Sequence, residues 1–161
     1  MKKIKKVREV MWTDVIVCKK ETSLKELLEK FKGFHTFPLV PVVDDENKLV
    51  GVVRIENLID AFLPYDRELI RYTPFIDEFW DEDIFEAKIA PEMGILVLVE
   101  DIMDYRFDAI DADEDIKKAY KLMRMNNRCH LPVVEKGGEL VGIVGIFDII
   151  REVFRMQGVI D

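Results

Sequence analysis

The sequence predicts a mixed α/β (α+β) fold in which two βαββα repeats pack about a pseudo-twofold axis, with a partly helical insert between them. Three observations support this prediction. Blocks of sequence recur in order after 91 or 92 residues, the blocks alternate between helical and strand-like hydrophobic patterns, and 49% of the 161 residues are hydrophobic. This hydrophobic content is sufficient to form a packed core. A unit of about 55 residues buries too little surface to be secure alone, so the two copies should form one cooperative body.

The duplication appears in four matched blocks of the two copies. The first is a methionine that closes a short lead-in, and the second is an amphipathic helical stripe with apolar residues at i, i+3, i+4 and i+7. The last two are short apolar runs. In pairs, the blocks are Met11 and Met103, the stripes that begin at Leu24 and Ile116, residues 40–43 and 131–134, and residues 49–53 and 140–144.

The first half of each copy should be a short strand followed by the amphipathic helix. The strands are expected at residues 15–17 and 107–110. In copy one the helix should begin near Ser23, which opens a capping-box pattern. In copy two an aspartate just before the stripe should be the N-cap, either Asp113 or Asp115.

Two apolar strands and a closing helix should complete each copy. The strands are the last two matched blocks, and the polar connectors between them, residues 44–48 and 135–139, have the composition of hairpin turns. The closing helix is expected over residues 57–62 in copy one and 148–156 in copy two, each with an apolar face.

Residues 64–98 form an aromatic and acidic insert between copy one (7–63) and copy two (99–156). Its large apolar side chains, among them Phe79 and Trp80, recur near helical spacing, so the insert should be ordered and partly helical. It either packs over its own repeats or offers a docking surface to a regulated partner.

Composition and missing motifs narrow the class of function. The net charge of −8 repels polyanions, so nucleic-acid binding is not expected. No stretch approaches the roughly 20 apolar residues that cross a bilayer, so membrane insertion is not expected. Two cysteines without a disulfide framework predict a reducing, cytoplasmic location. Nucleophilic triads, P-loops and zinc spacing are absent, and the acidic run at 81–83 lacks the spacing of a calcium loop; the sequence therefore predicts neither an enzyme nor a metal site.

The order and spacing of the repeated blocks resemble the CBS (cystathionine β-synthase) domain family, whose tandem pairs are called Bateman modules. The stretch His-Leu-Pro-Val-Val at 130–134 is especially typical, and the resemblance covers residues 7–63 and 99–156. It implies a non-catalytic regulatory module that binds an adenosine-containing ligand (AMP, ADP, ATP or S-adenosylmethionine) in clefts between the repeats. The ligand is regulatory, so no cofactor is expected. The resemblance further implies a homodimer that signals to an enzyme or transporter.

The family's ligand signature is a glycine, two apolar residues, a threonine or serine, two variable residues and an aspartate. In copy two this pattern falls on residues 142–148, from Gly142 to Asp148. The resemblance implies that Asp148 accepts hydrogen bonds from ribose hydroxyls, with Ile146 beside it. Gly145 replaces the hydroxyl near the phosphate; the side-chain donor is lost, while bare backbone approaches an anion more closely. Asp148 could instead, or also, cap its helix.

Copy one matches the signature less well. Asn57 stands in place of the aspartate; it can cap the helix and offers one acceptor and a donor to a ribose. Arg54 replaces the hydroxyl residue. Its guanidinium could hold a phosphate, including one that belongs to a ligand in the other site, fill its own site, or lie in solvent. Copy two should therefore be the better nucleoside pocket, with one ligand per chain.

In the family the base lies against the first strand of a repeat and the strand that carries Pro-Val. Each residue at these positions could equally be ordinary core. In copy two these positions are Phe107, Ala109, Ile110, Leu131, Pro132 and Val133. Two alternative functions stay open: a sensor of divalent cations or ionic strength that uses the acidic surface, and a purely structural dimerisation module that binds no nucleotide.

Overall fold

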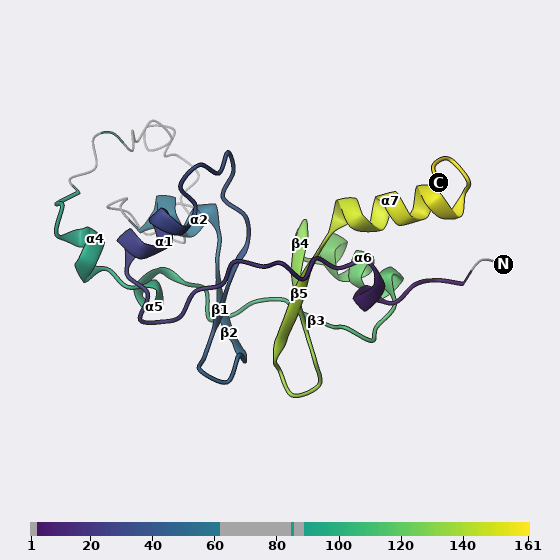
Figure 1. Ribbon diagram of the computed structural model, residues 1–161, viewed down its shortest axis with the longest axis horizontal. Helices are drawn as coiled ribbons and strands as arrows, with labels where there is room; N and C mark the ends of the chain where they lie inside the picture. Colours follow the sequence, from purple (N-terminus) through teal and green to yellow (C-terminus); the bar gives the residue numbers. More distant parts are fainter. Residues whose placement is uncertain (1–2, 62–84, 86–88) are drawn as a thin grey trace, which may run out of the picture.

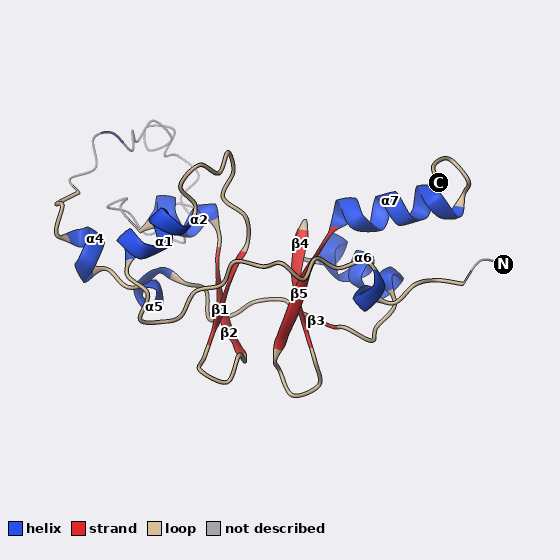
Figure 2. Ribbon diagram, viewed as in Figure 1, coloured by secondary structure: helices blue, strands red, loops and turns tan. Residues whose placement is uncertain are grey.

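The duplicated halves of the chain form two separate sheets in the computed structural model, which describes residues 3–61, 85 and 89–161. We call residues 7–63 repeat 1 and residues 99–156 repeat 2. Figure 1 shows the two sheets side by side in the middle of the molecule, with α1 (Leu24–Lys30) and α2 (Ile55–Asp60) of repeat 1 at one end and α6 (Ile116–Met125) and α7 (Ile146–Met156) of repeat 2 at the other. Figure 2 shows the same arrangement by secondary structure. The predicted mixed α/β fold is confirmed.

Repeat 1 contains a two-stranded antiparallel sheet and two helices. Ser23 caps the first helix as predicted, because its hydroxyl accepts a hydrogen bond from the backbone N–H of Glu26 at 3.2 Å. Every residue of the first strand is buried. The elements are the 3-10 turn η1 (Val7–Glu9), α1 (Leu24–Lys30), β1 (Val40–Val43), β2 (Leu49–Val53) and α2 (Ile55–Asp60).

Repeat 2 contains a three-stranded sheet of order β3-β4-β5, in which the first pair of strands is parallel and the second antiparallel. The N-cap of its first long helix is Asp115, whose carboxylate accepts a hydrogen bond from the backbone N–H of Lys118 at 2.8 Å. The elements are α5 (Val99–Ile102), β3 (Ile110–Asp111), α6 (Ile116–Met125), β4 (His130–Val134), β5 (Leu140–Gly145) and α7 (Ile146–Met156), and a short helix α4 (Met93–Leu96) precedes them.

The first strand of each repeat is shorter than predicted. Residues 15–17 form no strand; Cys18 alone bridges to Val42 in parallel. In repeat 2 the strand expected at 107–110 is reduced to β3. The reason is visible in Figure 1, where the chain crosses from one repeat to the other just before each of these segments. The segment therefore meets the sheet edge only at its end, and a strand needs a neighbouring backbone to pair with.

Each closing helix begins two residues earlier than predicted. Asn57 and Asp148 are not the first residues of α2 and α7 but the third. Their side chains accept the backbone N–H of the residue that precedes the helix, Arg54 at 2.7 Å and Gly145 at 2.8 Å. Both residues thus satisfy a backbone donor at a helix start, as predicted, but from inside the helix.

The two lead-in segments, residues 7–12 and 99–104, each pack against the other repeat. Val7 is fully buried in the core cluster of repeat 2, and Val99 and Met103 are buried in the core cluster of repeat 1. Each core is therefore completed by a segment that the duplication assigns to the other copy. This exchange makes the two repeats one body, although their buried residues form two clusters.

The hairpin turns of the two repeats also join. Leu49 donates its backbone N–H to the carbonyl of Gly138 at 3.0 Å, and Leu140 donates its own to the carbonyl of Asn47 at 2.9 Å. The two bonds connect equivalent positions with the roles of the repeats exchanged, as a pseudo-twofold axis requires. The amide of Asn47 adds a bond to the carbonyl of Leu140 at 2.9 Å.

Little of the predicted insert helix can be compared with the structure. Phe75, Phe79, Trp80 and the acidic run at 81–83 lie outside the described residues. The described part contributes α4, where Gly94 lies against the side chain of Lys25 on α1. In the part of the chain that the structure describes, no helix combines the length and the apolar character that a membrane span requires.

Candidate functional site

The signature segment of repeat 2 places Asp148 in the first turn of α7, just beyond the end of β5. One carboxylate oxygen accepts the backbone N–H of Gly145 at 2.8 Å, and the other accepts the indole N–H of Trp12 at 3.1 Å. Asp148 is only 8% exposed. The carboxylate expected to hold a ribose therefore already accepts a hydrogen bond at each oxygen in this structure, and one of those bonds comes from the lead-in of repeat 1.

The two signature glycines allow close approaches of different kinds. A side chain on Gly142 would collide with the backbone carbonyl of Trp12, so this glycine admits the crossed lead-in rather than facing open space. A Cβ on Gly145 would lie 3.2 Å from the Cδ2 atom of His130 and 3.3 Å from a carboxylate oxygen of Asp148. Gly145 thus lets the imidazole ring lie beside the start of α7.

In repeat 1 the side chain at the hydroxyl position makes an ion pair. The Nη1 atom of Arg54 lies 3.0 Å from a carboxylate oxygen of Asp104, whose own side chain is 45% exposed against 15% for the arginine. The amide of Asn57 is used at the start of α2, as described above. Arg54 is therefore neither a solvated surface residue nor alone in its site.

A pocket of about 230 Å³ lies between the repeats. Repeat 1 contributes the approach to β1 and the turn from β2 into α2, and repeat 2 contributes the residues before and at the start of β4. The lining residues are Phe37, Pro38, Leu39, Arg54, Ile55, Glu56, Asn127, Arg128, Cys129 and His130. The pocket therefore brings Arg54 together with residues some 75 positions away in the sequence.

Two arginines, one from each repeat, give this pocket its positive charge. Burial, followed by the positive charge of Arg128, lowers the pKa of Arg54 below its usual value, and Asp104 opposes that effect. Arg128 lies 3.4 Å from a carboxylate oxygen of Asp108. Like charges held close together at a partly buried site are stabilised by an anion that bridges them.

His130 connects this pocket to the signature of repeat 2. It lines the pocket, and its ring lies over Gly145, whose N–H bonds Asp148. A continuous line of residues thus runs from Asp148 through Gly145 and His130 to the two arginines. A ligand with a sugar at one end and phosphate at the other matches this order of groups.

Most of the residues proposed to contact the base are buried in repeat 2. Ile110, Leu131 and Val133 belong to the core cluster of repeat 2, and Pro132 is buried. Phe107 and Ala109 are half-buried, and Ala109 and Ile110 line a different pocket of about 440 Å³ beside α6. For most of these residues the structure shows core packing.

The ligand signature did not identify four residues of the site, namely Trp12, Asp104, Arg128 and His130. His130 belongs to the typical stretch at 130–134, but its place in the pocket was not predicted. Trp12 and Asp104 stand at equivalent positions, because each is the last residue of its lead-in and follows a matched methionine, Met11 or Met103. Extending the alignment of the two copies by one residue would have paired them. Arg128 lies in a loop outside the matched blocks, and no sequence signal marks it.

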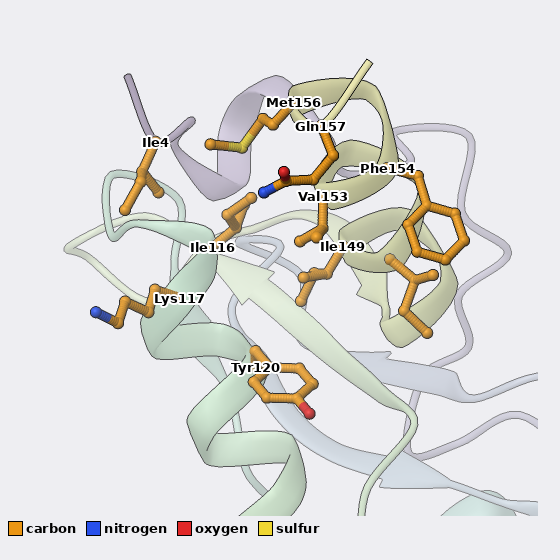
Figure 3. A pocket seen from close by; sticks show the side chains of 10 residues that line it. Ile4, Ile116, Lys117, Tyr120, Ile149, Val153, Phe154, Met156 and Gln157 are labelled. Atoms are coloured by element: carbon orange, nitrogen blue, oxygen red, sulfur yellow. The ribbon is translucent and has the colours of Figure 1, made fainter. Parts of the chain in front are cut away.

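A third hollow, of about 480 Å³, is apolar and lies along α6 and α7 (Figure 3). Tyr120 of α6 lies at one end of this hollow and Ile4 of the N-terminal segment at the other, with Ile149 and Val153 of α7 between them. Tyr120, Val153 and Phe154 are each more than two-fifths exposed. Within residues 3–61, 85 and 89–161, no group of three or more histidine, cysteine, aspartate or glutamate residues is placed to hold a metal ion.

Comparisons with known proteins agree with the duplicated architecture. The chain is 25% identical over 155 residues to an uncharacterized 17.7 kDa protein of Acidianus ambivalens, which covers 94% of this chain and 77% of that protein. It is 29% identical over 152 residues to inosine-5′-monophosphate dehydrogenase of Aquifex aeolicus, which covers 94% of this chain but only 25% of the enzyme.

Two solved structures share the fold. The structure of CBSX2 in complex with AMP has a TM-score of 0.67 and 23% identity, and the match covers 94% of this chain and 98% of that one. The CBS domain pair of protein MJ0100, in complex with 5′-methylthioadenosine and S-adenosyl-L-methionine, has a TM-score of 0.65 and 21% identity, covering 96% and 99%. A family model for the CBS domain matches residues 7–64 and again residues 99–155, so the chain belongs to the CBS domain family and carries a tandem pair.

Proposed function

We propose that this chain is a regulatory module, without catalysis of its own, that binds an adenine nucleotide (AMP, ADP or ATP) between its repeats. Three ligands named for its structural neighbours, AMP, 5′-methylthioadenosine and S-adenosyl-L-methionine, all contain adenosine. The match to a quarter of a dehydrogenase supports an enzyme as the kind of protein that such a module regulates. We expect it to act in the cytoplasm.

The observation that carries the proposal is the pocket between the repeats with Arg54 and Arg128 on its wall. Among the described residues, each guanidinium makes one ion pair, Arg54 with Asp104 and Arg128 with Asp108, and the charge of Glu56 also acts on Arg54. A guanidinium has five N–H donors, so further donors are left for a ligand. Arginine holds phosphate through paired hydrogen bonds, and the effect is stronger where water is partly excluded. The phosphate should lie here and the ribose toward Asp148.

Binding at this place can act on the arrangement of the two repeats. A ligand shifts a conformational equilibrium only by its difference in affinity for the two states. Arg54 and Arg128 belong to different repeats, so a phosphate that contacts both binds best when the repeats are close together. Nucleotide should therefore favour one relative placement of the repeats, which a partner protein can sense.

Calorimetric titration with AMP, ADP, ATP and S-adenosylmethionine tests this function, with Mg²⁺ alone as a separate titration. We expect one adenosine-containing ligand per chain and a heat of binding that Mg²⁺ alone does not produce. Binding of Mg²⁺ without nucleotide would instead favour the cation sensor. No binding by any of these compounds would favour the purely structural module.

We also propose that the module is a homodimer that buries the apolar hollow along α6 and α7. Exposed Tyr120, Val153 and Phe154 form a contiguous apolar face of the kind that subunits cover. Val153→Asp should shift the mass measured by light scattering from dimer to monomer. Ile95→Asp on α4, at a residue that is 67% exposed, is the matched control and should leave the mass unchanged.

A further inference from the structure

Trp12 and Asp104 occupy equivalent positions in the two repeats and reach across the molecule in the same way. Each makes an antiparallel bridge to the signature strand of the other repeat, Trp12 to Ile143 and Asp104 to Val52. Backbone hydrogen bonds run in both directions, at 2.8 and 2.9 Å for the first pair and at 3.1 and 2.9 Å for the second. The fold thus holds one lead-in residue against each signature segment.

The side chains at these two positions differ in chemistry. Asp104 supplies a carboxylate to Arg54, whereas Trp12 supplies an N–H to the carboxylate of Asp148. The indole of Trp12 is held through that N–H while the residue is 61% exposed, and Asp148 beneath it is 8% exposed. A large apolar ring that lies mostly in water is held in place with little burial.

We propose that Trp12 is a gate on the sugar site of repeat 2, and that its indole N–H and a ribose hydroxyl compete for the same oxygen of Asp148. The inference rests on the proposed nucleotide function and adds the residue that regulates entry. The other oxygen of Asp148 stays with Gly145 at the start of α7, so only the oxygen held by Trp12 can be exchanged without loosening the helix.

The movement required is confined to one side chain. The backbone of Trp12 is fixed by its two hydrogen bonds to Ile143 and by its close approach to Gly142. Rotation of the indole away from the protein breaks one hydrogen bond and uncovers Asp148. A ligand hydroxyl restores the lost bond, because it donates to the same oxygen. A ligand that lacks a hydroxyl cannot, so the gate selects for an intact ribose.

Trp12→Phe tests the gate, because it keeps an aromatic ring and removes the competing N–H. The matched control is Trp80→Phe, which changes the other tryptophan of the sequence. Compared with that control, Trp12→Phe should bind AMP about 10- to 100-fold more tightly in calorimetric titration, the range for one hydrogen bond to a charged group. Its affinity for 2′,3′-dideoxy-AMP should not change.

A second measurement keeps the native tryptophan in place. In the Trp80→Phe protein, Trp12 is the remaining tryptophan of the sequence, and saturation with AMP should shift the tryptophan emission. Any of three results overturns the gate and leaves the nucleotide function intact. The first is that AMP binds without a change in Trp12 emission, and the second is that Trp12→Phe binds AMP no more tightly than the control. The third is that the affinity of Trp12→Phe for 2′,3′-dideoxy-AMP rises as much as its affinity for AMP. If neither the native protein nor any variant binds AMP, ADP or ATP, the nucleotide function and the gate both fail. Binding by Trp12→Phe alone supports a gate that is closed in the native protein.

Discussion

The guanidinium of Arg54 lies 3.0 Å from the carboxylate of Asp104, which joins the signature segment of repeat 1 to the lead-in of repeat 2. The same arginine lies close enough to Arg128 for that positive charge to lower its pKa. Asp104 therefore offsets a repulsion between two cations as well as fixing a lead-in. Removing it leaves both arginines in the pocket without that counter-charge.

Asp104→Asn should lower the free energy of unfolding by about 1 kcal/mol, the size of a partly exposed ion pair. Added phosphate should stabilise this variant more than the native protein, because an anion replaces the lost charge. The measurement is thermal unfolding with and without phosphate. The control is Asp113→Asn, whose pair with Arg8 at 3.4 Å is more exposed. An equal effect of phosphate on both variants would contradict a cationic pocket.

The stability of the folded protein at low pH should depend on the carboxylate of Glu152. Its bonds to Arg155, at 2.7 and 2.9 Å, and its ion pair with Lys5 at 3.1 Å lower its pKa from 4.5 to about 2. A lowered pKa in the folded state stabilises the fold above pH 4.5, and this contribution is lost as the pH falls toward 2. The difference in melting temperature between the native protein and Glu152→Gln should be constant above pH 4.5 and shrink below it. Glu29→Gln, at an exposed site on α1, should show no such change.

The two cysteines should differ in reactivity toward a thiol reagent at pH 8. Burial raises the pKa of Cys18 to about 11, and its side chain is 2% exposed, whereas Cys129 is exposed. Thiolate is the reacting form, so one thiol should react in the folded protein and the other only after unfolding. Cys129→Ser should remove the fast reaction. Because Cys129 lines the pocket between the repeats, nucleotide should slow its labelling.

Asn47 should hold the two hairpin turns together. It has a positive φ of 63° and donates through its amide to Leu140 of repeat 2. Asn47→Gly keeps the backbone conformation and removes the bond, so the free energy of unfolding should fall by about 1 kcal/mol. Asn127→Gly is the matched control, because Asn127 also has a positive φ, of 52°. Urea unfolding measures the free energy of unfolding of both variants. An equal decrease in the two would mean that the hydrogen bond from Asn47 adds no stability.

Local signals predicted the elements of this fold well. The cap at Ser23 and the apolar runs of β1, β2 and β4 depend on neighbours in the sequence, and the structure shows them where the pattern placed them. The choice between Asp113 and Asp115 could not be made from the pattern, because both residues precede the helical stripe. The backbone N–H of Lys118 donates a hydrogen bond to the side chain of Asp115, so Asp115 is the N-cap.

Relationships between distant segments could not be predicted. The lead-in that contains Val7 has the same apolar pattern whether it packs on its own repeat or on the other, so the exchange leaves no local signal. The length of the first strand in each repeat was overestimated, because it depends on where the crossing chain meets a sheet, and that point leaves no local signal either. The pairing of Arg54 with Arg128 and of Trp12 with Asp148 follows from the pseudo-twofold arrangement rather than from any motif.

Titration of ATP into the native protein and into Arg128→Gln tests the central claim most directly. Arg128 belongs to the repeat that does not contain Arg54, so a phosphate held between the repeats depends on both. We predict one ATP per chain and an affinity about 10- to 100-fold weaker in Arg128→Gln, the range for one hydrogen bond to a charged group. The control Arg124→Gln, at an exposed residue of α6 outside the pocket, should bind like the native protein. Equal affinities of the three proteins, or no binding of ATP, would contradict the account.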